Sequence, residues 1–177
     1  MPTGEPPLNT FEDRSQGFWL TSMANLAYCM LTGVWKEVIP VAVEALIIDD
    51  SPVARLIIRH HLEQIGCTIA GEAGNPAAGL DLFRKIKPSL VTLDLIMPTV
   101  DGVDTLQAFR IMRKENPSTR ILVVSAVPFE KTRRTMTEEG ALAYIAKPFN
   151  KFSFNKSRRR LLHAFPELAA ALRRHLT

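Results

Sequence analysis

Cysteine is scarce in this chain: only Cys29 and Cys67 occur among its 177 residues. Two cysteines cannot build a disulfide scaffold or a cysteine-based zinc site. Such sparse cysteine suits a reducing compartment, so we expect a cytoplasmic protein. Hydrophobic residues make up 46% and charged residues 23% of the chain, close to the balance of an average globular protein. The chain is therefore not disordered throughout, and its length suits one domain with extensions.

A strong charge of one sign is also lacking over most of the chain. The net charge is +4, yet residues 41–147 hold thirteen acidic and thirteen basic side chains and sum to zero. Residues 1–40 sum to −2, and residues 148–177 sum to +6. The basic isoelectric point of about 9.3 therefore belongs to the C-terminal tail and does not indicate a basic domain surface.

No charged residue occurs from Ser15 to Trp35, a stretch of 21 residues. This length would suit a membrane span, but only 13 of the residues are apolar, and at helical spacing one face holds Leu20, Met23, Ala24, Ala27, Leu31 and Val34. We therefore expect an amphipathic helix docked on protein. A membrane anchor and a poorly ordered segment, with a start at Met23 or Met30, stay open as alternatives. A secretory signal is disfavoured because no positive charge precedes Arg14.

From residue 41 onward, short apolar runs alternate with stretches of helical character. The runs are rich in Val, Ile and Leu and continuous, as in strands buried on both faces: Ala45–Ile48, Thr68–Ala70, Leu90–Leu93, Ile121–Val124 and Leu142–Ala146. Start and stop signals predict helices from Ser51-Pro52 to Gly66, Asn75-Pro76 to Lys87-Pro88, Asp101-Gly102 to Asn116-Pro117, and Glu130 to Gly140. Five βα units predict an α/β fold, a parallel sheet with helices on both faces.

The fifth helix and the two ends of the chain complete the expected domain organisation. Apolar residues that can hold a fifth helix on the sheet are Phe152, Phe154, Leu161, Leu162 and Phe165, and Pro166 then interrupts it. We expect an N-terminal extension over residues 1–40 with its helix at 15–35, an α/β domain over 41–165, and a basic helical tail over 166–177.

Polar side chains stand where the apolar runs end. Asp49 and Asp50 end the first run, Asp94 the third, Ser125 the fourth and Lys147 the fifth. The carboxyl ends of parallel strands line one edge of the sheet, so we expect these groups to converge there. Three neighbouring carboxylates need a compensating cation, and a few hard oxygen ligands suit Mg²⁺. With a lysine opposite, the constellation is equipment for phosphoryl chemistry with a carboxylate nucleophile.

Four segments carry a resemblance to a known family. ALIIDDSPVAR, VTLDLIMPTVDG, ILVVSA and YIAKPF resemble the signature blocks of response-regulator receiver domains, over about residues 43–150. The spacing is similar too, with 44 residues from Asp50 to Asp94, 31 to Ser125 and 22 to Lys147. The resemblance implies a flavodoxin-like, doubly wound (βα)5 fold with strand order 2-1-3-4-5.

The resemblance also implies a role for each residue. Asp94 matches the phospho-accepting aspartate, Asp50 the direct Mg²⁺ ligand, Asp49 an acidic residue that helps to hold the ion, and the backbone carbonyl of Ile96 a further ligand. Lys147 matches the lysine that pairs with Asp94 and then with the phosphoryl group, and its bond to Pro148 is expected to be cis. Ser125 matches the switching hydroxyl and Tyr144 the aromatic that turns inward with it. Ile96 and Val127 match the positions that flank the path of the hydrolytic water, where two bulky apolar side chains predict a long-lived phosphoryl group.

These roles imply partners and an activity. We expect a single-domain response regulator that takes a phosphoryl group from a sensor histidine kinase or a histidine phosphotransfer protein, and that catalyses only its own phosphorylation and dephosphorylation. The resemblance implies a target protein that binds a surface including Arg133, Arg134 and Tyr144. Only 30 residues follow Lys147, so we expect no output domain in the chain. The sequence of the VTLDLIMP segment resembles the chemotaxis type of receiver domain.

Three other interpretations compete with this one. The basic cluster Lys156, Arg158, Arg159 and Arg160 suggests a tail that binds nucleic acid, but most charge runs are solvated helix faces. A phosphohydrolase of the haloacid dehalogenase type needs a second aspartate close to the first, whereas Leu95 and Ile96 follow Asp94. A degenerate receiver that only docks is disfavoured because every active-site position is filled. Outside the site, His60 and His61 are expected at the surface or partly packed, and Cys67 in the core.

Overall fold

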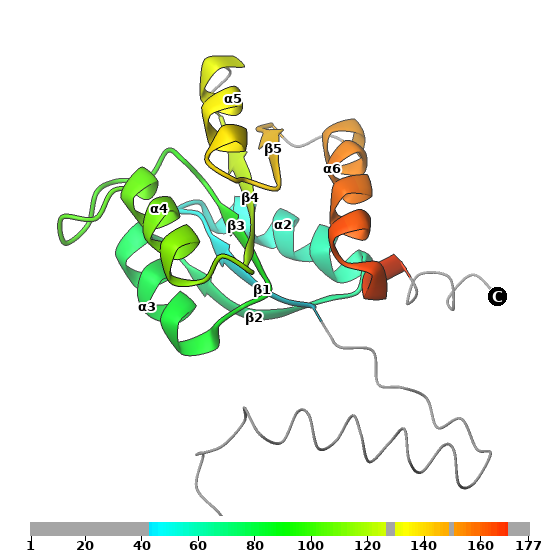
Figure 1. Ribbon diagram of the computed structural model, residues 1–177, viewed down its shortest axis with the longest axis horizontal. Helices are drawn as coiled ribbons and strands as arrows, with labels where there is room; N and C mark the ends of the chain where they lie inside the picture. The colour runs from blue at the N-terminus through cyan, green and yellow to red at the C-terminus, as the bar shows by residue number, and fades with distance from the viewer. Residues whose placement is uncertain (1–42, 127–129, 149–150, 170–177) are drawn as a thin grey trace, which may run out of the picture. The chain divides into compact units, whose positions relative to one another are not determined.

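The chain forms a five-stranded parallel sheet with helices on both faces (Figure 1). This computed structural model describes residues 43–126, 130–148 and 151–169, and in the first turns of the last helix it describes only some side chains. The strand order β2-β1-β3-β4-β5 confirms the predicted order. The elements are β1 (Val43–Ile48), α2 (Pro52–Gln64), β2 (Cys67–Ala73), α3 (Pro76–Ile86), β3 (Leu90–Leu93), α4 (Thr105–Glu115), β4 (Arg120–Ser125), α5 (Glu130–Glu138), β5 (Ala143–Ala146) and α6 (Lys151–Ala164).

The apolar runs became strands, but the two at the sheet edges are less buried than their sequences predict. In the run Leu142–Ala146 only Ala143 and Ile145 are buried and Ala146 is exposed, so the prediction that this run is buried on both faces is wrong. Strand β3 is buried throughout, and β1 and β4 are buried except for Glu44 and Arg120. Strand β2 lies at the sheet edge, and Thr68 and Ala70 are exposed there, so the prediction that Thr68–Ala70 is buried on both faces is wrong. The register with β1 also shifts beside Ala45, which leaves one extra residue in β2.

Two helices begin at the predicted caps. The side chain of Ser51 accepts a hydrogen bond from the backbone of Ala54, and Pro52 occupies the first turn of α2. Asn75 does the same for Ala78 at the start of α3. In each case the cap satisfies a helix N–H that has no partner within the helix.

The predicted start of α4 is wrong by three residues. Asp101 and Gly102 form a turn with positive φ angles of 51° and 73°, and the helix begins only after Asp104. The Asp104 side chain accepts from the backbone of Gln107, whose side chain accepts from the backbone of Asp104. This reciprocal capping box satisfies two donors at once and therefore fixes the helix start at Asp104.

Two apolar cores lie on opposite faces of the sheet, and their alternation positions the site. Helices α2 and α6 cover the core that contains Ile47 and Ile145, whereas α3, α4 and α5 cover the other (Figure 1). Because side chains alternate along a strand, Asp49 and Lys147 continue the face of Ile47 and Ile145. Asp94 follows Leu93, which belongs to the opposite core, and so turns to the same side as Asp49.

The C-terminal part packs on the α2 side of the sheet. Of the apolar residues expected to hold the last helix, Phe154, Leu161 and Phe165 are buried. A helical turn over residues 166–169 follows, in which Leu168 is buried. Cys67 is buried as predicted. The predicted helix at 15–35, the extension 1–40 and most of the basic tail lie outside the described residues. None of the helices described has the length and apolar character to cross a membrane.

Candidate active site at the carboxyl edge of the sheet

Three side chains meet where strands β1, β3 and β5 end. Nζ of Lys147 donates a hydrogen bond to Oδ2 of Asp94 at 2.6 Å, and it lies 2.7 Å from Oδ2 of Asp49. Both aspartates are buried, and the Lys147 side chain is 16% exposed. The peptide bond between Lys147 and Pro148 is cis, as expected. The structure thus brings together three residues that stand up to 98 positions apart in the sequence, which is the convergence predicted from strand ends.

Backbone amides hold the far oxygen of each buried carboxylate. The N–H of Ser51 donates to Oδ1 of Asp49 at 3.0 Å, and the N–H of Ile96 donates to Oδ1 of Asp94 at 2.9 Å. Each carboxylate therefore has one oxygen fixed by the chain that follows it and turns the other toward Lys147. This arrangement orients both Oδ2 atoms toward the same small space.

Burial sets the electrostatics of the site. Burial raises the pKa of Asp49, while the Lys147 ammonium and the N–H of Ser51 act in the opposite direction. For Lys147, burial lowers the pKa, but the contacts with Asp49 and Asp94 outweigh burial, and the pKa is raised overall. The ammonium therefore stays charged at neutral pH, and the Asp49 charge is held at an energetic cost.

The donor set fits a divalent cation. Asp50 is exposed, and one carboxylate oxygen from each of Asp49, Asp50 and Asp94 lies within 4.8 Å of the others. With Lys147 these groups carry a formal charge of −2. Oδ2 of Asp49 is buried, and its close polar neighbour among the described residues is the Lys147 ammonium at 2.7 Å. A few hard oxygens with uncompensated charge suit Mg²⁺, which keeps several waters when bound.

The two predicted switch residues touch each other on the other face of the sheet. Ser125 is buried at the end of β4, and its hydroxyl is joined to that of Tyr144 by a hydrogen bond. Burial raises the pKa of Tyr144; the bond with Ser125 lowers it, and the Asp94 carboxylate raises it further. The phenol therefore stays protonated, and it lies close enough to Asp94 for the carboxylate charge to raise its pKa.

The two residues predicted to set the phosphoryl lifetime are only partly placed. The side chain of Ile96 is 53% exposed, two residues after Asp94. Val127 lies outside the described residues. The backbone N–H of Ile96 donates to the Asp94 carboxylate, which directs this loop around Asp94.

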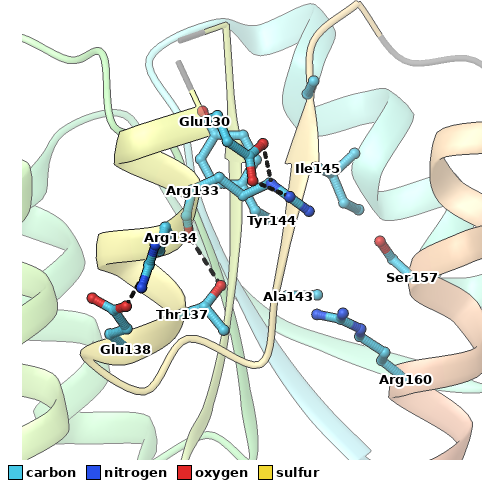
Figure 2. A pocket seen from close by; sticks show the side chains of 11 residues that line it. Glu130, Arg133, Arg134, Thr137, Glu138, Ala143, Tyr144, Ile145, Ser157 and Arg160 are labelled. Atoms are coloured by element: carbon cyan, nitrogen blue, oxygen red, sulfur yellow. Dashed lines mark hydrogen bonds and ion pairs between the residues drawn. The ribbon is translucent and has the colours of Figure 1, made fainter. Parts of the chain in front are cut away.

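A hollow of about 420 Å³ lies between α5, β5 and α6, next to Tyr144 (Figure 2). Arg133 and Arg134 line it from α5, and Ser157 and Arg160 line it from α6. Arg133 is paired with Glu130 and Arg134 with Glu138 on the same helix. The predicted partner surface is therefore concave, and it includes Tyr144 itself.

The sequence interpretation missed one contact at the site. Nη1 of Arg55, on α2, donates to the backbone carbonyl of Asp49 at 2.7 Å, and Nε donates to Glu72 of β2 at 3.1 Å. Arg55 belongs to the ALIIDDSPVAR segment, one helical turn after the cap Ser51, so its return toward the strand end is visible in the spacing. The spacing does not show, however, that its guanidinium reaches two different elements.

A family model described as the response regulator receiver domain matches residues 45–157, which contain the three aspartates, Lys147, Ser125 and Tyr144. The chain belongs to this family. Receiver domains are signalling domains, and the match confirms the family resemblance of the four sequence segments.

Curated relatives share this receiver domain within proteins of different length. The probable C4-dicarboxylate response regulator DctR of Bacillus subtilis is 36% identical over 107 residues, which are 60% of this chain and 46% of that protein. The chemotaxis protein CheY of Thermotoga maritima is 32% identical over 104 residues, 59% of this chain and 84% of CheY. This chain thus spans about half the length of DctR and most of CheY.

Solved receiver structures share the fold. CheY in a complex with CheX, BeF3 and Mg from Borrelia burgdorferi is 22% identical, with a TM-score of 0.61 over 69% of this chain and 88% of that chain. The isolated receiver domain of RcsB from Salmonella enterica is 20% identical, with a TM-score of 0.63 over 72% of this chain and 98% of that chain. Both likenesses concern the fold alone.

Proposed function

We propose that this receiver accepts a phosphoryl group on Asp94 in a Mg²⁺-dependent step and works as a single-domain response regulator. The observation that supports it most strongly is Lys147 bridging two buried carboxylates, with a third carboxylate within 4.8 Å. Folding alone does not require such a cluster, because burying several like charges costs free energy. Its charge suits a ligand that brings a divalent cation and phosphoryl oxygens.

The step transfers phosphorus from nitrogen to oxygen. A carboxylate oxygen of Asp94 attacks the phosphorus of a phosphohistidine partner; the O–P bond forms as the P–N bond breaks, and the imidazole nitrogen leaves with the electron pair. Asp50, Asp49, Asp94 and the Ile96 carbonyl would hold Mg²⁺, which when bound would supply positive charge to the phosphoryl oxygens. Lys147 moves from the free Asp94 carboxylate to a phosphoryl oxygen and keeps the transferred group in place.

The phosphodonor docks beside the acceptor, on a sensor histidine kinase or a histidine phosphotransfer protein. Val53 and Leu56 on the first two turns of α2 are 67% and 65% exposed, and Ile96 after Asp94 is 53% exposed. Exposed apolar side chains near a cluster of charged groups favour a partner with an apolar face of its own. We expect that face to place the phosphohistidine over Asp94.

Intact mass spectrometry with a small acyl phosphate as donor tests the chemistry without knowledge of the kinase. Wild type gains the phosphoryl mass in Mg²⁺ and not in EDTA, whereas Asp94→Asn gains nothing. Asp81→Asn, an exposed aspartate on α3, is the matched control and behaves as wild type. Asp50→Ala weakens Mg²⁺ binding more than Asp49→Ala. A phosphorylated Asp94→Asn protein would refute the proposal.

The output is a changed surface around α5, β5 and α6. The bond between Ser125 and Tyr144 supports a two-state relay, since a phosphoryl group on Asp94 offers Ser125 a new acceptor and frees Tyr144 to move. We expect beryllofluoride with Mg²⁺ to change amide exchange over residues 130–148 in wild type and much less in Ser125→Ala. Unchanged exchange in wild type would exclude the relay.

The phosphoryl group is proposed to be long-lived, since neither Ile96 nor Val127 can orient a water by hydrogen bonding. The double variant Ile96→Asn with Val127→Glu should lose the group about tenfold faster, the effect of a barrier lower by ~1.4 kcal/mol. The measurement is the decay of phosphorylated protein after removal of the donor. Decay no faster than that of wild type would show that these side chains do not set the lifetime.

Nucleic-acid binding by the C-terminal part is the second candidate. Arg158, Arg159 and Arg160 are all exposed on α6, which is what a phosphate-binding face requires. Retention on duplex DNA that falls steeply with salt would favour it, because phosphate contacts release counterions. Retention that is absent at low salt would exclude it.

A further inference from the structure

Arg55 makes contacts that the phosphoryl chemistry above does not use. From α2 it reaches back to the end of β1, where Nη1 lies 2.7 Å from the carbonyl oxygen of Asp49 and 3.5 Å from that of Asp50. Its side chain is 20% exposed, so the guanidinium is largely held by protein. One cation thus binds the backbone of two consecutive acidic residues.

Glu72 fixes the orientation of that guanidinium. Its Oε2 accepts from Nε of Arg55 at 3.1 Å, and its Oε1 accepts from Nε and Nη2 of Arg59 at 2.9 and 2.6 Å. Glu72 stands on β2 opposite Ile47 in the register with β1. The carboxylate therefore ties the arginine fork to the neighbouring strand and leaves Nη1 aimed at the acidic loop.

The Asp50 carboxylate needs support of this kind. Asp50 is exposed, and among the described residues its side chain makes no hydrogen bond or ion pair, in contrast to the amide-bound carboxylates of Asp49 and Asp94. Its position therefore depends on the backbone that carries it. That backbone is held on one side by the bond from Asp49 N–H to the Ala73 carbonyl at 3.0 Å, and on the other by Arg55.

We propose that Arg55, oriented by Glu72, is a positioning residue that fixes the Asp49–Asp50 peptide and so sets the Mg²⁺ affinity of the site. The inference rests on the proposed function, because it takes Asp50 as a metal ligand. Outer-shell residues that orient metal ligands typically contribute about 10–100-fold in metal affinity. Arg55 acts through the backbone carbonyls of Asp49 and Asp50 and makes no contact with the carboxylate oxygens proposed to bind Mg²⁺.

Charge and position predict opposite signs for the loss of Arg55. A cation beside the site repels Mg²⁺, so removal of its charge alone would tighten Mg²⁺ binding. Removal of a backbone support would weaken binding. Arg59 is a matched control, because it carries the same charge on the same helix and binds the same Glu72, yet it contacts neither carbonyl.

The test is calorimetric titration of the full chain with MgCl2 alone. We expect Arg55→Met to weaken Mg²⁺ binding by about tenfold or more, Arg55→Lys to fall in between, and Arg59→Met to bind as wild type or slightly more tightly. At saturating Mg²⁺, Arg55→Met should accept the phosphoryl group from an acyl phosphate at a rate near that of wild type, since Asp94 and Lys147 are intact. This split between affinity and rate separates positioning from general damage to the fold.

Several results would overturn the inference. Unchanged or tighter Mg²⁺ binding by Arg55→Met would, and so would equal weakening by Arg59→Met. If urea unfolding shows that Arg55→Met is not folded, the MgCl2 titration is repeated with Arg55→Lys and Glu72→Gln. Wild-type Mg²⁺ affinity in both of these variants would overturn the inference. Absence of Mg²⁺ binding in wild type would instead refute the proposed function.

Discussion

At the scale of single residues, Lys147 supplies the positive charge that compensates two buried carboxylates. Its ammonium lies between two buried carboxylate oxygens, at 2.6 and 2.7 Å, and the third carboxylate of the cluster is at the surface. An ion pair that is buried is expensive to assemble, but it is still more expensive to break from one side, because the remaining charge has no partner. Lys147 is therefore as much a part of the fold as of the proposed chemistry.

We expect Lys147→Met to lower the free energy of unfolding by about 3 kcal/mol without Mg²⁺, the lower end of the range for breaking a buried pair. Mg²⁺ should recover much of this loss, since an ion that binds only the native state stabilises it by mass action. Urea unfolding at pH 7 with and without MgCl2 measures both effects. Lys131→Met, an exposed lysine on α5, is the charge-matched control. Equal stability of the two variants would show that the aspartates do not need the ammonium.

Cys67 gives a prediction about pH. Burial raises the pKa of its thiol from 9.0 to about 12, with a smaller contribution from Glu167. Between these two values the unfolded chain loses the thiol proton while the native chain keeps it. The native state thus binds more protons, and stability falls as pH rises, by up to ~1.4 kcal/mol per pH unit for this group.

The stability contributed by the protonated thiol is fully present below pH 9. Urea midpoints between pH 8.5 and 10.5 should therefore fall more steeply in wild type than in Cys67→Ala, which has no group to ionise there. The comparison of slopes cancels the constant cost of the smaller side chain. Parallel slopes would mean that the thiol ionises as easily in the folded chain as in the unfolded one.

At the scale of elements, helix α4 shows how a start signal is decided. Two aspartates lie three residues apart, and only Asp104 caps the helix, whereas Asp101 sits in a left-handed turn. Asp104→Ala should cost about 1 kcal/mol of stability, the typical value for a lost N-cap. Asp101→Asn should be nearly neutral, because asparagine tolerates the left-handed region. Thermal or urea unfolding of the two variants checks this, and similar losses in both would place the functional start of α4 at Asp101.

The sequence predicted elements where one local signal decides and failed where tertiary context decides. Continuous apolar runs predicted β1, β3 and β4, because a strand that is buried on both faces is apolar throughout, whichever elements cover it. The exposure of residues in β2 was not predicted, because a run such as Thr68–Ala70 does not indicate whether its strand lies in the middle or at the edge of the sheet. The Asp101-Gly102 pair is a turn signal as strong as Asp104, and only the capping box with Gln107 decides between them.

The same division holds at the site. The meeting of Asp49, Asp94 and Lys147 follows from strand ends and sheet order. Arg55 was missed because its role depends on Glu72, seventeen residues away on another element, and on a side chain long enough to reach both. Contacts made by flexible side chains across elements are set by packing, which no spacing rule encodes.

At the scale of the whole molecule, the core extends beyond the segment that the family model matches. The match ends at residue 157, yet Leu161, Phe165 and Leu168 are buried in the core that holds Val43 and Cys67. The chain after α6 therefore belongs to the same core as the starts of β1 and β2. In the predicted basic tail, residues 166–177, the structure describes 166–169, and Leu168 is buried there, whereas Arg158 and Arg159 on α6 are exposed.

We expect this C-terminal turn to contribute to global stability. Leu168 is 2% exposed, and truncation of a buried leucine to alanine costs about 2–5 kcal/mol; near a chain end the surroundings relax more easily, which favours the lower value. Urea unfolding should thus shift clearly in Leu168→Ala and hardly at all in Arg159→Ala, an exposed position on α6. Loss of the cover should also raise the alkylation rate of Cys67 at pH 8, measured by peptide mass mapping. If Leu168→Ala matches Arg159→Ala in both measurements, the turn at 166–169 is an appendage and the core ends with α6.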